Sequence, residues 1–332
     1  VLDGAEKVLA ARGDLFQMGG LIVSISTDPM TGDPSIIPLG VSGLTRALSG
    51  AATWEKFDGR SSDWTRCDPP TRHLSLLSEA SSYRYLPHLV GVARQPHFRE
   101  SDGELVTHAG YDEVSKRFGV FDAKQFPMPD PTREAALAAK TLLEDLVKEF
   151  HFVHVTDKAT ALSAIFTAVT RPTLPYAPAF HAKAPVFGSG KTYLCELIGA
   201  FGGPGRNSKV SYPTTPEEAT KAMLSLLLTS PAVVEFDDMD TDWIPHGTIK
   251  RMLTADHITD RILGVSKTAT VSTRCTFLGS GNNVGPVRDL LRRVATIHVD
   301  PRCATPATLN YQGRPVEKVR KDRGRYVAAV LT

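Results

Sequence analysis

Cysteine is scarce in this 332-residue chain, and its four copies are too widely spaced to form a metal-binding pair. Cys67, Cys195, Cys275 and Cys303 include no C-x-x-C spacing, which argues against both a zinc ribbon and a disulfide framework. No apolar run reaches the length of a membrane span, and no secretory signal precedes the first predicted helix. We therefore expect a cytoplasmic protein with no membrane partner.

Neither sign of charge dominates the chain as a whole, whose formal net charge is +2. Apolar residues make up 42% and charged residues 22%, which is typical of a soluble globular protein. The basic residues are unevenly distributed, since residues 250–332 contain 15 Lys and Arg but only 6 Asp and Glu. Such a concentration of basic charge is typical of proteins that bind phosphates, whether of a nucleotide or of a polynucleotide.

A proline-rich stretch, DAKQFPMPDPTRE, divides the chain into two predicted parts. Residues 1–125 mix short helices and strands and are predicted to form a small α+β accessory domain. Residues 126–332 begin with helices over 132–150 and 157–169 and then alternate strands with helices. This alternation predicts an α/β fold with a parallel sheet. The final segment, RGRYVAAVLT, is predicted to be a helix that continues past residue 332, so we expect a longer polypeptide.

The segment APVFGSGKTYL resembles a phosphate-binding loop that has lost its first glycine. Gly188, Ser189 and Gly190 allow a tight turn whose backbone N–H groups point into a concavity suited to phosphate oxygens. Lys191 is placed to reach the terminal phosphates of ATP, and the Thr192 hydroxyl to bind Mg²⁺. The following apolar segment predicts a helix whose N-terminus faces the anion. The alternative is a glycine-rich turn before an ordinary helix.

A pair of acids follows the predicted strand PAVVEF, about 45 residues after the lysine of the loop. A nucleotide hydrolase needs one carboxylate at a strand end for the magnesium shell and a second to polarise the attacking water. We assign Asp237 to the metal and Asp238 to the water. A solvated acidic turn is the alternative for this pair.

Two later segments supply polar groups of the kind that motor ATPases place near the γ-phosphate. The strand RCTFLGSGNN ends in an amide pair, of which we choose Asn282 over Asn283 as the sensor of hydrolysis. The segment VRDLLRRVATIHV predicts a helix and then a strand. Arg292 or Arg293, with Arg293 preferred because it directly precedes the strand, is predicted to reach the γ-phosphate of a neighbouring subunit. Both signals are weak alone, because amides favour turns and arginine pairs are common on surfaces.

Between the acids and the amide pair, RILGVSKTATVSTR contains two β-prone runs, 261–265 and 268–273. They flank Ser266 and Lys267 and predict a hairpin. A lysine at the tip of a projecting hairpin suits contact with a nucleic-acid backbone. A hairpin with a merely soluble tip is the alternative.

Taken in order, GSGKT, VVEFDD, the hairpin, GSGNN and DLLRRV resemble the helicase-type AAA+ ATPases. They are most similar to the superfamily-three and MCM-like replicative helicases of phages and integrative mobile elements, which are often associated with a primase. The resemblance covers residues 130–332 strongly and 1–125 more loosely. It implies a P-loop ATPase core with a pre-sensor hairpin, preceded by an N-terminal accessory domain.

The resemblance further implies a ring, in the form of a hexamer, with ATP and Mg²⁺ at each subunit interface. It implies that Arg293 acts in trans, that Lys267 grips single-stranded or forked DNA in the pore, and that a primase or replication initiator is a partner. It also implies a second-sensor arginine near Arg320 or Arg323 and a C-terminal winged-helix region outside this chain. Two residues depart from the pattern: Pro185 replaces the first glycine, and Asp238 stands where glutamate is usual.

Three functions therefore compete. The first is an ATP-dependent DNA helicase of a mobile element or phage. The second is a replication initiator or helicase loader that binds DNA as a nucleotide switch without unwinding it. The third is a small-molecule kinase, since P-loops serve many phosphoryl transfers. A kinase gives no reason for a lysine-tipped hairpin between the acids and the amide pair.

Overall fold

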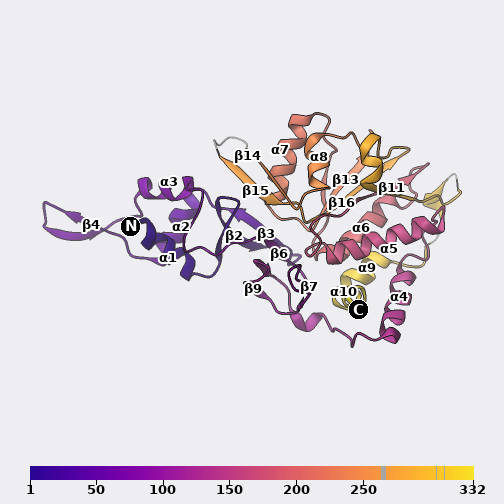
Figure 1. The fold of residues 1–332 in the computed structure, drawn as a ribbon, viewed down its shortest axis with the longest axis horizontal. Coiled ribbons are helices and arrows are strands. Elements are labelled where there is room, and N and C mark those ends of the chain that lie inside the picture. Colours follow the sequence, from indigo (N-terminus) through magenta and orange to yellow (C-terminus); the bar gives the residue numbers. More distant parts are fainter. Residues whose placement is uncertain (263–266, 304, 310) are drawn as a thin grey trace.

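A computed structural model describes residues 1–262, 267–303, 305–309 and 311–332, and its elements are labelled in Figure 1. The α-helices are α1 (Leu2–Ala11), α2 (Val41–Ala51), α3 (Thr71–Glu79), α4 (Arg133–Leu146), α5 (Val155–Thr170), α6 (Lys191–Gly202), α7 (Pro216–Leu227), α8 (Gly247–Met252), α9 (Pro315–Lys321) and α10 (Arg323–Leu331). Short 3₁₀ turns are η1 (Ala123–Gln125), η2 (Arg288–Arg292) and η3 (Pro306–Thr308).

The strands of the N-terminal part are β1 (Leu15–Met18), β2 (Leu21–Thr27), β3 (Pro34–Pro38), β4 (Glu55–Asp58), β5 (Asp63–Arg66), β6 (Gly91–Ala93), β7 (His97–Phe98), β8 (Leu105–Val106), β9 (Gly110–Asp112) and β10 (Arg117–Gly119). Those of the remainder are β11 (Ala179–Ala184), β12 (Ser208–Val210), β13 (Val233–Met239), β14 (His257–Arg261), β15 (Thr268–Ser272), β16 (Thr276–Asn282) and β17 (Val294–His298).

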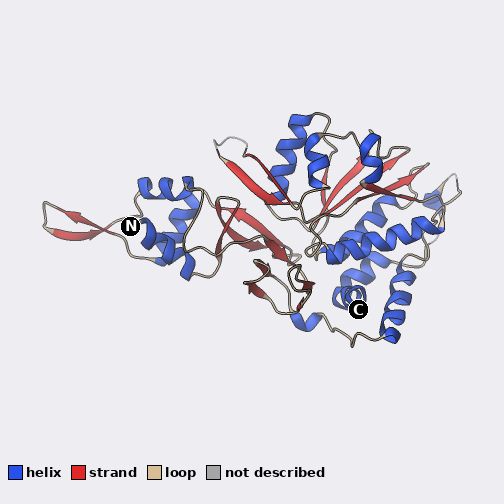
Figure 2. Ribbon diagram, viewed as in Figure 1, coloured by secondary structure: helices blue, strands red, loops and turns tan. Residues whose placement is uncertain are grey.

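The centre of the molecule is a five-stranded sheet with the order β12-β13-β16-β11-β17, and every neighbouring pair in it is parallel. Helices lie on both sides of this sheet (Figure 2). The predicted α/β class with a parallel sheet is therefore confirmed. Among the described helices, none combines the length and the apolar character that crossing a bilayer requires.

Alternating side chains of the central strands enter two separate cores. Phe277 packs with the apolar residues of α7 and α8, whereas Leu278, its neighbour in β16, packs with those of α5 and α6. Both side chains are almost completely buried. Because successive residues of a strand point to opposite faces, an uninterrupted apolar run such as this one requires cover on both faces.

The N-terminal part contributes to two cores. Helices α1, α2 and α3 enclose a small cluster together with Leu15 of β1 and Ile22 of β2, and these helices lie at one end of the molecule in Figure 1. Phe16 of β1 and Val23 of β2 instead share a cluster with Phe236 of the central sheet. At the β1–β2 turn a Cβ on Gly19 would lie only 2.2 Å from the Thr270 carbonyl oxygen of β15, so this turn packs directly on the hairpin. The domain boundary at residue 125 stays a prediction.

Several predicted boundaries were wrong. The helix predicted over 132–150 ends at Leu146, because Glu149 turns away and accepts hydrogen bonds from the backbone N–H groups of Gln312 and Gly313. The first hairpin strand begins at His257 rather than at 261 and runs to Arg261, since Ile258 is buried in the core and pairs with Val271. Residues 263–265 of the predicted run lie outside the described residues. The predicted tip residue Ser266 lies outside the described residues.

Candidate functional site

The loop 185–190 joins β11 to α6 in a conformation that depends on two glycines. Gly188 has φ +70° and Gly190 has φ +88°, both in the left-handed region that residues with a Cβ rarely adopt. The Ser189 hydroxyl closes the loop by donating to the Val186 carbonyl at 2.6 Å. The predicted tight turn and the helix after it are present, with Lys191 as the first residue of the helix and Pro185 at the start of the loop; phosphate binding by this loop stays a prediction.

The strand order brings the predicted site residues together at the carboxyl ends of the central strands. Strand β16 lies between β11, which leads into the loop, and β13, which carries the acids. All three strands are parallel, so their carboxyl ends meet. Ligands of open parallel sheets bind outside these ends. The Lys191 ammonium donates to the Asn282 amide oxygen at 2.6 Å, and Asn283 instead lies exposed at the loop, 3.5 Å from the Pro185 carbonyl oxygen.

Burial lowers the pKa of Lys191, and the negative charge of Asp238 acts in the opposite direction. Asp238 is exposed and adopts φ +48°, immediately after Asp237. The backbone N–H of Asp238 donates to the Asp237 carboxylate at 3.0 Å. The two acids thus differ in environment: Asp237 is held by hydrogen bonds at the end of β13, whereas Asp238 faces solvent close to Lys191.

Asp237 is held by two residues that the sequence did not single out. Its carboxylate accepts from Ser280 at 3.0 Å and from Lys209 at 2.8 Å. Burial raises the pKa of Asp237, but these hydrogen bonds outweigh burial and leave the pKa below its ordinary value. Lys209 could have been suspected, because a lysine in a short strand beside an acidic strand end is a natural counter-ion.

The donor set fits a magnesium ion that binds together with a nucleotide. No group of three or more His, Cys, Asp or Glu able to hold a metal occurs in the described part of the chain. Mg²⁺ is usually held by one or two protein oxygens plus phosphate oxygens and water. The Thr192 hydroxyl and the Asp237 carboxylate are oxygen ligands of this kind, and the lysine at 2.8 Å from Asp237 marks where a cation is accommodated.

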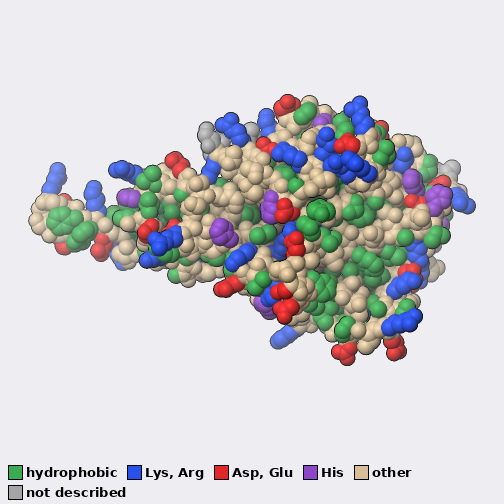
Figure 3. Space-filling view, viewed as in Figure 1, with side chains coloured by type: hydrophobic (Ala, Val, Ile, Leu, Met, Phe, Trp, Pro, Cys, Tyr) green, Lys and Arg blue, Asp and Glu red, His purple; other side chains and the backbone are tan. Residues whose placement is uncertain are grey.

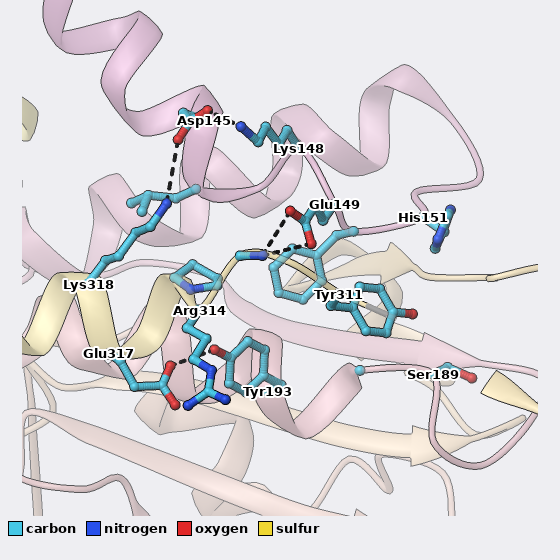
Figure 4. Close-up of a pocket in the computed structure, with 15 residues that line it drawn as sticks. Asp145, Lys148, Glu149, His151, Ser189, Tyr193, Tyr311, Arg314, Glu317 and Lys318 are labelled. Carbon is cyan, nitrogen blue, oxygen red and sulfur yellow. Dashed lines mark hydrogen bonds and ion pairs between the residues drawn. The ribbon is translucent and has the colours of Figure 1, made fainter. Parts of the chain in front are cut away.

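A cavity of about 390 Å³ opens beside the loop, and Figure 4 shows the side chains that line it. Ser189 and Tyr193 line it from the loop and α6, and Glu149 and Phe150 from the segment after α4. The rings of Phe150 and Tyr193 lie 6.3 Å apart at an angle of 25°. Such a cavity, with flat aromatic faces and polar groups, suits a planar heterocycle. The sequence did not identify it, since its lining residues come from three separate segments, 145–151, 189–193 and 311–318.

Of the two arginines expected as second sensors, Arg320 is exposed and its role stays a prediction. Arg323 does not lie at the loop: it donates to the carbonyls of Ala200 and Phe201, near the C-terminal end of α6. Lys191 lies nine residues away along that helix, which is about 14 Å. Arg314 lines the cavity instead. It is exposed, and its guanidinium lies on the same side as Tyr193 in Figure 4.

Arg292 and Arg293 lie at the amino ends of the strands, at the end of the sheet opposite the loop. The Arg293 carbonyl accepts from the N–H of Ala179, the first residue of β11, so the arginine lies about one strand length, roughly 20 Å, from Lys191. Its guanidinium donates to the Lys250 carbonyl at 3.2 Å. Arg292 is exposed, and basic side chains gather around α8 on the surface in Figure 3. Neither arginine can reach the loop of its own chain.

Lys267 contacts the N-terminal part of the chain. Its ammonium donates to the carbonyls of Ser78 and Ala80, at 2.9 and 2.7 Å, where α3 ends. A cation at this end of a helix satisfies otherwise unpaired carbonyls and complements the helix dipole. Burial lowers the pKa of Lys267. In this structure the lysine is engaged with protein rather than exposed at a tip, and its contact with DNA stays a prediction.

Comparison with known proteins gave structural neighbours only. No family model and no curated protein matches the chain. The apo A form of the NrS-1 C-terminal region is similar at a TM-score of 0.46 and 12% identity, over 98% of this chain and 68% of that one. A structure of JCV helicase with a bound thiazolopyridine compound is similar at a TM-score of 0.30 and 14% identity, over 60% of each chain.

Proposed function

We propose that this chain is an ATP hydrolase that acts as a DNA helicase. The observation that carries the proposal is the meeting of Lys191, Asn282 and the acids Asp237 and Asp238 at the carboxyl ends of three adjacent parallel strands. A glycine loop at a helix start, a lysine, an amide and two carboxylates together form a complete set for phosphoryl transfer to water.

The triphosphate is bound by the N–H groups of Gly188, Ser189 and Gly190. The Lys191 ammonium breaks its hydrogen bond with Asn282 and contacts the terminal phosphates instead. Thr192 and Asp237 would hold Mg²⁺, which would neutralise the charge that develops on the phosphate oxygens. The adenine occupies the cavity beside Tyr193.

The attacking water is oriented by the Asp238 carboxylate, which accepts a hydrogen bond from it. The Asn282 amide then lies beside the γ-phosphate. Loss of the γ-phosphate changes the contacts of this amide and thereby the position of β16, the strand that carries Asn282. The adjoining subunit's Arg293, with its Arg292 as the second choice, stabilises the transition state. The distance of Arg293 from the loop of its own chain supports this role in trans, and we infer that the subunits assemble into a hexameric ring.

The test is the variant Lys191→Ala, with Lys221→Ala on the exposed face of α7 as the matched control. We expect Lys191→Ala to lose ATP hydrolysis and unwinding of forked DNA together, while Lys221→Ala retains both. Strand separation by Lys191→Ala would refute the proposal.

The alternative is an initiator or helicase loader that binds DNA without unwinding it. The contact of Lys267 with α3 favours this alternative, because a lysine bound to protein carbonyls cannot at the same time grip DNA in the pore of a helicase. If DNA passes the hairpin, Lys267→Ala removes DNA stimulation of ATP hydrolysis and leaves the basal rate. DNA binding by the unaltered chain with no unwinding would favour the loader.

A further inference from the structure

Four arginines line a small cavity at the amino ends of the central strands, at the end of the sheet opposite the candidate nucleotide site. The cavity measures about 30 Å³ and lies next to Ala232 and Cys275, which directly precede β13 and β16. Four guanidinium side chains line it, and each is at least nine-tenths buried: Arg94, Arg117, Arg171 and Arg274. They come from the N-terminal part, from the end of α5 and from the segment before β16, so the cavity joins these parts.

Two of these arginines are ion-paired. Arg94 donates to Asp33 at 2.7 Å, and Arg274 contacts Glu100, with Asp256 at 3.9 Å. These carboxylates neutralise their own partners. They leave the other two guanidinium groups of the cavity without a counter-ion.

Arg171 and Arg117 have no carboxylate within 4.0 Å among the described residues. Arg171 donates to the carbonyls of Cys275 and Thr273 at 3.0 and 2.9 Å. Arg117 has a buried Nη2 with no hydrogen-bond partner in the described chain. Burial, followed by the charges of Arg274 and Arg171, lowers the pKa of Arg117 to about 9. A buried charge with no counter-ion destabilises the fold, so these two arginines need an anion that the described residues do not provide.

Two further polar atoms of the lining also lack partners. The Arg274 Nε is a donor, and the Gln95 Oε1 is an acceptor. The orientation of the Gln95 amide is set, because its Nε2 donates to the Val169 carbonyl at 3.2 Å. The cavity thus presents guanidinium donors and one amide acceptor to whatever occupies it.

We propose that this cavity binds a small inorganic oxyanion of the phosphate class. Water could pair with the orphaned donors and the acceptor but would leave two positive charges uncompensated. Chloride would compensate charge but cannot donate to Gln95. Hydrogen phosphate supplies oxygens for Arg117 and Arg274 and a P–OH donor for Gln95. At about 15 Å³ for one water, the cavity of about 30 Å³ has room for two waters, so an ion with four oxygens binds only when the lining side chains move slightly apart.

The experiment measures thermal unfolding of the full chain in phosphate, sulfate and chloride at equal ionic strength. It is run in parallel on Lys191→Ala, because phosphate could also bind the loop 185–190. We expect phosphate to raise the Tm saturably in both proteins, by roughly 4 °C at a hundredfold excess over Kd. Sulfate, which is fully deprotonated at neutral pH, raises it less. Equal effects of all three anions, or a phosphate effect lost in Lys191→Ala, would overturn the proposal.

Arg117→Met tests the unpaired charge, with the exposed Arg46→Met on α2 as control. We expect Arg117→Met to lose the phosphate response and to melt no lower than the unaltered chain without phosphate, while Arg46→Met keeps the response. If Arg117→Met does not fold, Gln95→Glu supplies the missing negative charge. We expect Gln95→Glu to have a higher Tm than the unaltered chain in phosphate-free buffer, and we expect phosphate to leave that Tm unchanged. A lower Tm with an undiminished phosphate response would contradict the site.

Discussion

The Lys191 ammonium donates a 2.6 Å hydrogen bond to the Asn282 amide oxygen, so the residue that begins α6 is held by the residue that ends β16. A buried ammonium needs an acceptor, and the amide provides one that carries no charge. The same amide is therefore positioned beside any phosphate that later takes the lysine. This contact links the loop to the central strand of the sheet.

Replacing Asn282 separates catalysis from binding. Asn282→Ala is expected to lower kcat for ATP hydrolysis by about 100-fold, because one positioned polar group is lost near the developing charge. KM for ATP changes less than about threefold. Steady-state phosphate release measures both. Asn283→Gly is the control, since Asn283 is exposed at φ +57°, a conformation that glycine adopts freely, and should behave as the unaltered chain. Equal effects of the two variants would contradict the assignment.

Glu235 of β13 gives a pH prediction. Its side chain is fully buried, and burial raises the pKa of Glu235 to about 7 despite a hydrogen bond from Asn207. In the unfolded chain the pKa is about 4.3, so between these values the folded state binds more protons than the unfolded state. Stability therefore falls as the pH rises from about 4.5 to about 7, and this contribution is constant above that range.

Glu235→Gln should remove that slope and stabilise the protein at pH 8, by up to about 3 kcal/mol. Urea unfolding at pH 5 and pH 8 measures the difference. Glu217→Gln, on the exposed first turn of α7, is the matched control and should leave the slope unchanged. A Glu235→Gln protein with the original pH dependence would show that the buried carboxyl does not cause it.

The aromatic cavity predicts an effect on nucleotide affinity. Tyr193→Ala removes one ring of the pair with Phe150 and the hydrogen bond to Glu317. Loss of one stacked base contact is worth roughly 1–3 kcal/mol, so the Kd for ATP should rise between about 5-fold and about 150-fold. Fluorescence titration with a labelled nucleotide measures it. Tyr176→Ala, at an exposed position before β11, should bind normally; unchanged binding by Tyr193→Ala would place the base elsewhere.

Action of Arg293 in trans predicts rescue on mixing. Arg293→Ala and Lys191→Ala are each expected to be inactive alone. A mixture of the two contains some interfaces with an intact lysine on one side and an intact arginine on the other. Its ATP hydrolysis should therefore exceed that of either variant, approaching about one quarter of the unaltered rate for random equal mixing. Absence of rescue in mixed assemblies would exclude a trans role, and Arg292→Ala would then be tested in the same way.

The parallel sheet and the loop before α6 could be predicted because their signals are local. An apolar strand followed by glycines and a helical pattern identifies the segment around Lys191, and the acids stand directly at the end of a strand. The partners of these residues could not be predicted. Lys209 reaches Asp237 only because β12 pairs with β13, and Lys267 reaches α3 only because the N-terminal part packs against the hairpin. Such contacts depend on strand order and tertiary packing, which no local pattern contains.

The most direct measurement is a structure of the chain with Mg²⁺ and a non-hydrolysable ATP analogue. Our account predicts the triphosphate on the backbone of residues 188–190, the Lys191 ammonium moved from Asn282 to the terminal phosphates, and the metal between Thr192 and Asp237. A nucleotide bound at another edge of the sheet, or a Lys191 that keeps its contact with Asn282 and touches no phosphate, would contradict it.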